Sequence, residues 1–163
     1  MFQETHETPF GWLTVFANND GVTWLNWDTD GQDDDRCAND VSRETWEQIH
    51  QYCRGDRRSF TVPLDPEASP ALKQWLNVMR GIDYGTTVTY KDFATMAGVP
   101  KAARAAGSSC ARNPIPLIIP CHRVTKIDGS LGNFGAIRRL GAKDPRNLGI
   151  KRALIDHEAR MMG

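Results

Sequence analysis

The feature that most limits the fold is a change of hydrophobic pattern at residues 65–70. Before this segment, residues 10–27 alternate apolar and polar side chains around the tripeptide NDG, which predicts a β-hairpin. After it, residues 70–81 carry apolar side chains at helical spacing. The segment itself, DPEASP, contains two prolines and breaks both periodicities. The pattern predicts an α+β chain in two domains, residues 1–69 and residues 70–163.

The first domain is expected to add one helix and one more strand to this hairpin. Residues 31–36, GQDDDR, predict a solvated acidic loop. Residues 41–54 place apolar side chains near helical spacing, with Ser42 as the expected N-cap. Residues 59–64 predict another short strand.

The second domain is expected to contain two short helices close together in sequence. Thr89 should cap a helix that Gly98 ends, and Pro100 should open a second helix over residues 101–112. Two short helices joined by a glycine-containing turn have the form of a helix-turn-helix. The second helix is rich in alanine, glycine and serine around one long cation, Arg104. Its composition suits close approach to another molecule and tight packing against another helix equally.

Composition bounds the class of protein. The apolar fraction of 40% is enough for a core. No apolar run approaches the ~20 residues that cross a bilayer. The first ten residues are polar and acidic, unlike a signal peptide, so we expect a cytoplasmic protein with no membrane partner.

The four cysteines are widely spaced and include no CxxC pair. A disulfide framework is not expected in a reducing compartment. A zinc site built from Cys37, His50 and Cys53 is an alternative, but the spacings do not match the usual structural-zinc patterns. We expect no metal and no organic cofactor.

The formal net charge of zero hides an asymmetry. Residues 1–69 hold 14 acidic and 5 basic side chains, a net of −9, whereas residues 100–152 hold 11 Lys and Arg against 2 Asp, a net of +9. The basic half favours a polyanionic partner over a merely dipolar protein.

The chemistry concentrates at Cys121-His122. The proline-bracketed apolar run 114–120 predicts a buried extended segment that leads to this dipeptide. A thiol reacts as the thiolate, and His122 could take its proton directly or through one water. Residues 148–158 predict a final helix, in which Glu158, with Asp156 behind it, is the best candidate to orient the histidine. The alternative is an inert buried cysteine.

The segment from Pro120 to Val124, PCHRV, resembles the signature of the O6-alkylguanine-DNA alkyltransferases. The similarity extends upstream through TYKDFATMAGVPKAARAAGSSCARNPIPLIIP and downstream through GSLGNFG and LGIKRALIDHE. It covers essentially residues 70–163, and PFGWLTVFANNDGVTWLNW looks like the family's variable first domain. The resemblance implies an RNase H-like antiparallel-sheet domain followed by a helical, winged helix-turn-helix-like domain. It also implies a monomer that binds double-stranded DNA containing O6-alkylguanine.

The resemblance also implies roles for single residues. Cys121 would take the alkyl group from a flipped-out base, with His122 as water-mediated base and Glu158 holding it. Asn113 would brace the active-site turn, and Tyr90 would donate to guanine N3. The recognition helix would enter the minor groove, with Arg104 filling the gap in the base stack. The other DNA contacts expected are Lys101, Ala103, Ala105, Gly107, Ser108, Arg112 and Arg123. In the substrate pocket, the carbonyls of Cys121 and Val124 would accept from the guanine amine, Phe134 would lie in the lid loop, and Gly135 would point its N–H toward O6.

The chain departs from the family pattern after Asn133, where AIRRLGAKDPRN is longer than expected. We expect its cations to add phosphate contacts, and a simple surface insertion is the alternative. Asp83 and Leu76 replace a usual proline and tryptophan, which we interpret as packing variation. Three other functions remain open: an alkyltransferase-like binding protein, which would carry tryptophan in place of the cysteine; a helix-turn-helix regulator; and a cysteine hydrolase.

Overall fold

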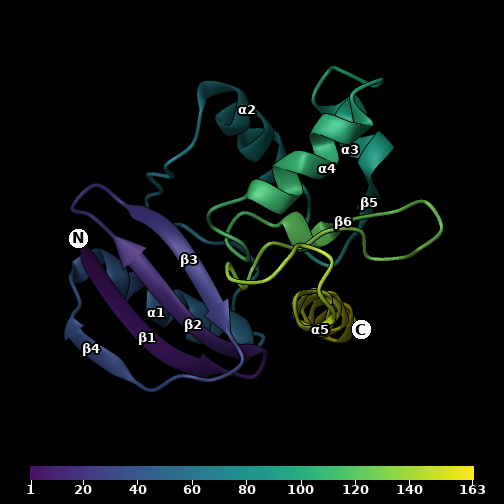
Figure 1. Ribbon diagram of the computed structural model, residues 1–163. Helices are drawn as coiled ribbons and strands as arrows, with labels where there is room; N and C mark the ends of the chain where they lie inside the picture. Colours follow the sequence, from purple (N-terminus) through teal and green to yellow (C-terminus); the bar gives the residue numbers. More distant parts are fainter.

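The computed structural model describes residues 1–163 and shows the expected α+β architecture, an N-terminal antiparallel sheet and a mainly helical remainder (Figure 1). The sheet has the order β3-β2-β1-β4, and helix α1 packs on one of its faces. Its elements are β1 (Phe2–Thr8), β2 (Gly11–Ala17), β3 (Val22–Asp28), β4 (Asp34–Cys37) and α1 (Asp40–Cys53).

The predicted hairpin is β2 and β3. Asn18 Oδ1 accepts from the backbone N–H groups of Asp20 and Gly21 at 2.8 and 2.9 Å and so closes the turn. Opposite pairs such as Val15 and Leu25 are buried, so the alternation in the sequence marks the face that α1 covers.

Two strands of the N-terminal sheet, β1 and β4, were not predicted. In β1 the buried positions include Glu4, whose carboxylate accepts from Ser42 Oγ at 3.0 Å and contacts His6 Nε2 at 2.8 Å. A strand whose inner face is polar gives no hydrophobic alternation. β4 lies in the segment expected to be an acidic loop, and it is an edge strand rich in exposed charge, so it has no apolar face.

Helix α1 begins three residues earlier than the predicted cap implies. Asn39, not Ser42, is the N-cap: its Oδ1 accepts from Ser42 N at 2.9 Å, and Ser42 Oγ accepts from Asn39 N at 3.0 Å. Ser42 is therefore the third helical residue of a capping box, where its hydroxyl also reaches Glu4.

The strand predicted over residues 59–64 is absent, apart from an isolated bridge between Leu64 and Val22. The side chain of Gln48 takes the place of a partner strand, since its Oε1 accepts from Thr61 N at 2.9 Å and its Nε2 donates to Thr61 Oγ1 at 2.8 Å. The segment that follows is the linker that the sequence predicts.

The helices beyond the linker lie close to their expected positions. Ser69 caps α2, and Thr89 caps α3, which ends before Gly98 with φ +79°. Pro100 does not open α4; that helix begins at Ala103 after an uncapped turn. The elements are α2 (Pro70–Met79), β5 (Val88–Thr89), α3 (Tyr90–Met96), α4 (Ala103–Arg112), a 3-10 turn (Cys121–Arg123), β6 (Val124–Thr125) and α5 (Pro145–Met162).

The apolar run at residues 114–120 is buried as expected but is a tight turn, not an extended strand. Ile119 N donates to Ile115 O at 2.9 Å, and Leu117 sits at φ +99°. The three prolines of the run lack N–H donors and cannot complete a strand ladder. A left-handed leucine costs about 1–3 kcal/mol, and the packing around it must hold it in place.

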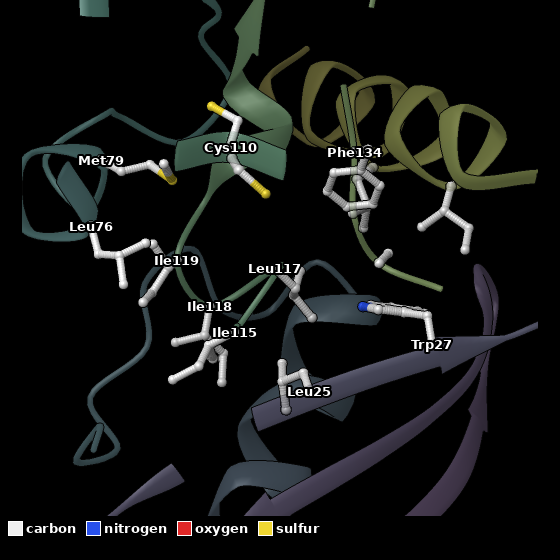
Figure 2. Packing of buried hydrophobic residues seen from close by; sticks show 14 of the residues in the cluster. Leu25, Trp27, Leu76, Met79, Cys110, Ile115, Leu117, Ile118, Ile119 and Phe134 are labelled. Atoms are coloured by element: carbon white, nitrogen blue, oxygen red, sulfur yellow. The ribbon is translucent and has the colours of Figure 1, made fainter. Parts of the chain in front are cut away.

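The hydrophobic core is continuous across the boundary at residue 69. One cluster joins Leu25 and Trp27 of the sheet to Ile115 and Leu117 of the turn, and it continues to Met79 of α2 (Figure 2). No helix is both long and apolar enough to span a bilayer.

The contribution of the Asn39 N-cap to the stability of α1 can be tested by mutation. Asn39→Ala should lower the free energy of unfolding by about 1–2 kcal/mol, because it removes the cap of a helix that covers the sheet. Urea denaturation measures the change. Glu47→Ala, at an exposed position of the same helix, is the matched control and should change stability by less than about 0.5 kcal/mol.

Candidate active site

Cys121 lies at the start of the 3-10 turn, fully buried, and lines none of the five main cavities. Asn113 holds the segment before it: Oδ1 accepts from Ile115 N at 2.9 Å and Nδ2 donates to Ile119 O at 2.8 Å. The N–H of Cys121 donates to the same Ile119 carbonyl at 2.8 Å. Asn113 therefore spans the turn that presents the cysteine, as its expected bracing role requires.

The next residue, His122, is also fully buried and contacts Glu158 of α5. Its Nε2 lies 2.6 Å from Glu158 Oε2, while Nδ1 has no hydrogen-bond partner. The carboxylate selects the tautomer with the proton on Nε2, which leaves the Nδ1 lone pair free to accept a proton.

Glu158 collects five hydrogen bonds. Besides His122, the carboxylate accepts from Arg123 Nε at 2.9 Å and Nη2 at 3.1 Å, from Tyr52 Oη at 2.6 Å and from Gly85 N at 3.1 Å. Burial acts to raise the pKa of the Glu158 carboxyl, but the His122 and Arg123 contacts outweigh it and hold the pKa well below its usual range. Burial lowers the pKa of His122 against the opposing pull of Glu158, so the imidazole rests neutral at pH 7.

Burial raises the pKa of the Cys121 thiol, while the Asn113 side chain and the cations of Lys151 and Arg138 act in the opposite direction. The resting site thus holds a neutral thiol beside a neutral imidazole. A thiolate forms here only together with proton transfer.

Helix α4 carries small side chains on both of its faces. Its inner face buries Ala106, Ser109 and Cys110. Of the expected DNA contacts, Gly107 is half-buried, and the exposed ones are Lys101, Ala103, Arg104, Ala105, Ser108 and Arg112. Small residues at exposed positions do not serve packing within the chain, so the structure favours an external partner over the helix-packing alternative.

Arg123 is not a DNA contact, and this expectation was wrong. Its guanidinium is buried, donating to Glu158 and, through Nη1, to Ile82 O at 2.7 Å. Its donors are consumed inside the protein, where it holds the carboxylate that orients His122.

Tyr90 lies under the loop that follows β6. Its hydroxyl accepts from Asn133 N at 3.0 Å and remains able to donate, because burial raises its pKa. Gly132, at φ +76°, passes so close that a Cβ there would lie 2.2 Å from the Tyr90 hydroxyl oxygen. Phe134 is fully buried in the core, and a Cβ on Gly135 would meet the Ala111 carbonyl at 2.3 Å.

Three of the four cations in the insertion have partners within the chain, so the expected phosphate contacts there stay a prediction. Arg139 pairs with Asp28 at 2.8 Å, and Arg146 pairs with Asp144 at 3.1 Å. Arg138 points inward, with its guanidinium 4.2 Å from the Trp24 ring centroid. The insertion docks on the N-terminal sheet.

Two residues of the site were missed by sequence reasoning. Lys151 is fully buried without an acidic partner; its Nζ donates to the carbonyls of Val124, Leu131 and Asn133. Tyr52 reaches Glu158 from α1, across the two parts of the chain. A lysine on the apolar stripe of the predicted final helix was a usable signal, whereas nothing in the sequence indicates the Tyr52 contact. No group of three or more His, Cys, Asp or Glu side chains is placed to hold a metal ion.

Comparison with known families agrees with this geometry. The model for the DNA-binding domain of 6-O-methylguanine DNA methyltransferase matches residues 70–160, and that for its ribonuclease-like domain matches residues 1–66. The chain belongs to this methyltransferase family. It is a transferase that repairs DNA by moving an alkyl group onto a cysteine.

Relatives with solved or curated functions align with most of this chain. The chain is 30% identical to the constitutive methylated-DNA–protein-cysteine methyltransferase of Bacillus subtilis over 82% of this chain and 86% of that protein. It is 33% identical to that of Methanosarcina acetivorans over 83% and 90%. The crystal structure of the Mycobacterium tuberculosis O6-methylguanine methyltransferase superposes with a TM-score of 0.79 at 28% identity, covering 98% of this chain and 93% of that one. A structure of the M. tuberculosis protein in complex with DNA matches equally well, with a TM-score of 0.79.

The buried carboxylate predicts acid sensitivity. The pKa values of His122 and Glu158 in the folded protein lie below their usual 6.5 and 4.5, so the unfolded chain binds more protons as pH falls. Stability should be full near pH 7 and should fall below about pH 6.5, more steeply below about 4.5. Glu158→Gln should lower the free energy of unfolding by about 3 kcal/mol at pH 7, because Arg123 loses its buried charged partner. It should also flatten the loss of stability at low pH, because the carboxylate that titrates there is gone.

Urea melts from pH 7 to pH 4 test this, with Asp156→Asn as control. Asp156 is exposed on the same helix, 3.7 Å from Arg152. An equally steep acid limb in Glu158→Gln would contradict the linkage.

Proposed function

We propose that the methyltransferase moves an alkyl group from O6 of guanine in double-stranded DNA to Sγ of Cys121, and that each molecule acts once. The observation that carries this is the contact between His122 Nε2 and Glu158 Oε2 at 2.6 Å, which leaves Nδ1 without a hydrogen-bond partner in the residue that follows the buried Cys121. The pair supplies a base of fixed tautomer next to the one cysteine that follows the braced turn.

The proposed step moves one proton and one alkyl group. The thiol proton passes to Nδ1 of His122, directly or through a water, while the S–C bond forms and the C–O6 bond breaks. Guanine leaves with the electron pair as an anion, which Tyr90 stabilises by donating to N3, and the proton on His122 then neutralises it. The thioether is stable, which makes the reaction stoichiometric.

DNA would be bound by α3 and α4 acting as a helix-turn-helix. Helices α3 and α4 pack together, and the exposed small residues of α4 allow close approach to a minor groove. The damaged nucleotide would be flipped out, as in other enzymes that act on bases, with exposed Arg104 filling the gap. Lys101 and Arg112 would neutralise phosphates beside it.

A fully buried sulfur cannot meet an external base, so part of the chain around Cys121 has to move, and we infer that the loop over Tyr90 is that part. Gly132 and Asn133 lie on the Tyr90 hydroxyl, where the guanine edge is expected. We infer that an entering base displaces these residues, while the carbonyls of Cys121 and Val124 take the guanine amine. Phe134 would then close over the base, with Gly135 offering its N–H to O6.

We propose that the first domain, residues 1–69, supports the fold, and that the second, residues 70–163, binds DNA and carries out alkyl transfer. We propose that a monomer suffices, because every residue of the step comes from one chain. A protein that repairs DNA works where DNA is held, which supports the expected cytoplasmic location.

Cys121→Ala should abolish alkyl transfer and leave binding to alkylated DNA largely intact, because the sulfur contributes chemistry and not groove contacts. Intact mass spectrometry after incubation with O6-methylguanine duplex should show one added methylene in the unsubstituted protein. Peptide mapping should place it on Cys121. Binding without any mass gain in the unsubstituted protein would instead indicate the alkyltransferase-like binding protein.

Arg104→Ala should slow repair of duplex DNA at least about tenfold, since nothing then offsets the few kcal/mol of unstacking. The reaction with free O6-benzylguanine needs no base flipping and serves as the internal control. Single-turnover rates on the two substrates measure the difference. Equal losses on both would exclude a role for Arg104 in the base stack.

A further inference from the structure

The arginine of the insertion that points inward, Arg138, joins the N-terminal sheet to the active-site turn. Its Nη2 donates to Leu25 O on strand β3 at 3.3 Å and to Asn113 O at 2.9 Å. Its guanidinium stacks on Trp24 of the same strand, with 4.2 Å between its central carbon and the ring centroid. One side chain thus bridges two parts of the chain that are 88 residues apart in sequence, at Leu25 and Asn113.

Asn113 is the residue that braces the turn before the nucleophile. Its side chain holds Ile115 N and Ile119 O, and Cys121 N donates to that same Ile119 carbonyl. Arg138 therefore binds the main-chain carbonyl of Asn113, while the side chain of Asn113 holds the turn. A shift of Asn113 would be transmitted to Cys121 through two hydrogen bonds.

Backbone contacts on either side of Arg138 strengthen the same seam. Leu25 N donates to Pro114 O at 2.9 Å, and Trp27 N donates to Ala136 O at 3.2 Å. These bonds occupy the free edge of β3 with the active-site turn and with the start of the insertion. Arg138 is the side chain that closes this seam.

The charge of Arg138 has no counter-ion. Arg139 and Arg146 in the same insertion each pair with an aspartate, whereas Arg138 forms no salt bridge and contacts only carbonyls and an aromatic ring. A partly desolvated cation of this kind is best stabilised when negative charge develops nearby. The ionising sulfur of Cys121 is such a charge. Burial lowers the pKa of Arg138 to about 10, so the group remains a cation at neutral pH, and it acts to lower the pKa of Cys121.

We propose that Arg138 is a positioning residue for alkyl transfer, which fixes the Asn113 brace against β3 and sets an uncompensated positive charge near Cys121. This role rests on the proposed function of Cys121. It gives the insertion and the N-terminal sheet a part in the reaction, in place of the phosphate contacts expected from the sequence.

The test compares Arg138→Met, Arg138→Lys and the matched control Arg139→Met, which removes a neighbouring exposed charge. Single-turnover transfer to O6-methylguanine duplex is measured against protein concentration and against pH, well below each melting temperature. Arg138→Met should slow the saturated rate about 10- to 100-fold, as small displacements of reacting groups do. It should also move the rising limb of the pH profile to higher pH, with DNA affinity and its salt dependence unchanged.

Arg138→Lys should return the rising limb of the pH profile to its wild-type position, because lysine keeps the positive charge. It should recover only part of the rate, because ammonium lacks the flat fork that stacks and binds two carbonyls. Arg139→Met should match the unsubstituted protein in rate and pH profile.

Three results would overturn the proposal. A wild-type rate and pH limb in Arg138→Met, even with a lower melting temperature, would leave Arg138 a purely structural residue. A weaker, less salt-dependent binding of DNA at unchanged saturated rate would restore the phosphate-contact interpretation. If Arg138→Met does not fold, a wild-type rate in Arg138→Lys would be decisive against the role. Absence of transfer in the unsubstituted protein would instead remove the proposed function itself.

Discussion

The buried carboxylate of Glu158 is the interaction on which the rest of the active site depends. A carboxylate 2% exposed is stable as an anion only if its oxygens are fully hydrogen-bonded, and here five donors converge on them. The donors come from α1, from the turn at Gly85 and from the Cys121–Arg123 turn. Folding of these distant segments therefore has to be complete before His122 has a partner. The tautomer that makes His122 a base is a consequence of tertiary structure.

The charges around Cys121 are arranged to favour ionisation without causing it. Burial raises the pKa of the thiol, and the two cations that act to lower it, Lys151 and Arg138, have carbonyl partners and no carboxylates. An acidic partner would cancel their field at the sulfur. Carbonyl partners satisfy the donors and leave the positive charge available. The site thus keeps a neutral thiol until a base accepts its proton, and it then stabilises the thiolate that forms.

Local sequence signals were reliable at several positions where a single segment decides the outcome, but not at Ser42 or Pro100. Thr89, Gly98 and the NDG turn act within a few residues, and the structure places each as predicted. Strand β1 was missed because Glu4 occupies an inner position, and only the distant Ser42 makes a buried carboxylate acceptable there. The strand predicted at residues 59–64 failed because Gln48, on a helix, satisfies Thr61.

The active-site residues show the same contrast between local and distant partners. The Cys-His pair and a carboxylate on the last helix could be predicted from the sequence, because the chemistry needs those residue types at positions that can meet. Arg123 was misassigned because a cation in a basic segment looks the same whether it faces a phosphate or Glu158. Arg138 and Tyr52 were unreadable for a related reason: their partners are a backbone carbonyl near the turn and a carboxylate 106 residues away.

The closed state of the site follows from two demands on the same few residues. The surface proposed to meet DNA has to be nearly flat and free of bulk, which α4 achieves with exposed alanine and serine and the half-buried Gly107. A reactive thiol in the same protein would be open to any small electrophile if nothing covered it. Gly132 and Asn133 rest on Tyr90, the residue proposed to contact the leaving guanine, and they are the cover that we infer for Cys121. On this proposal the Tyr90 hydroxyl both recognises the substrate and holds the inferred cover in place, so a base that takes up this hydroxyl would release the cover from Cys121.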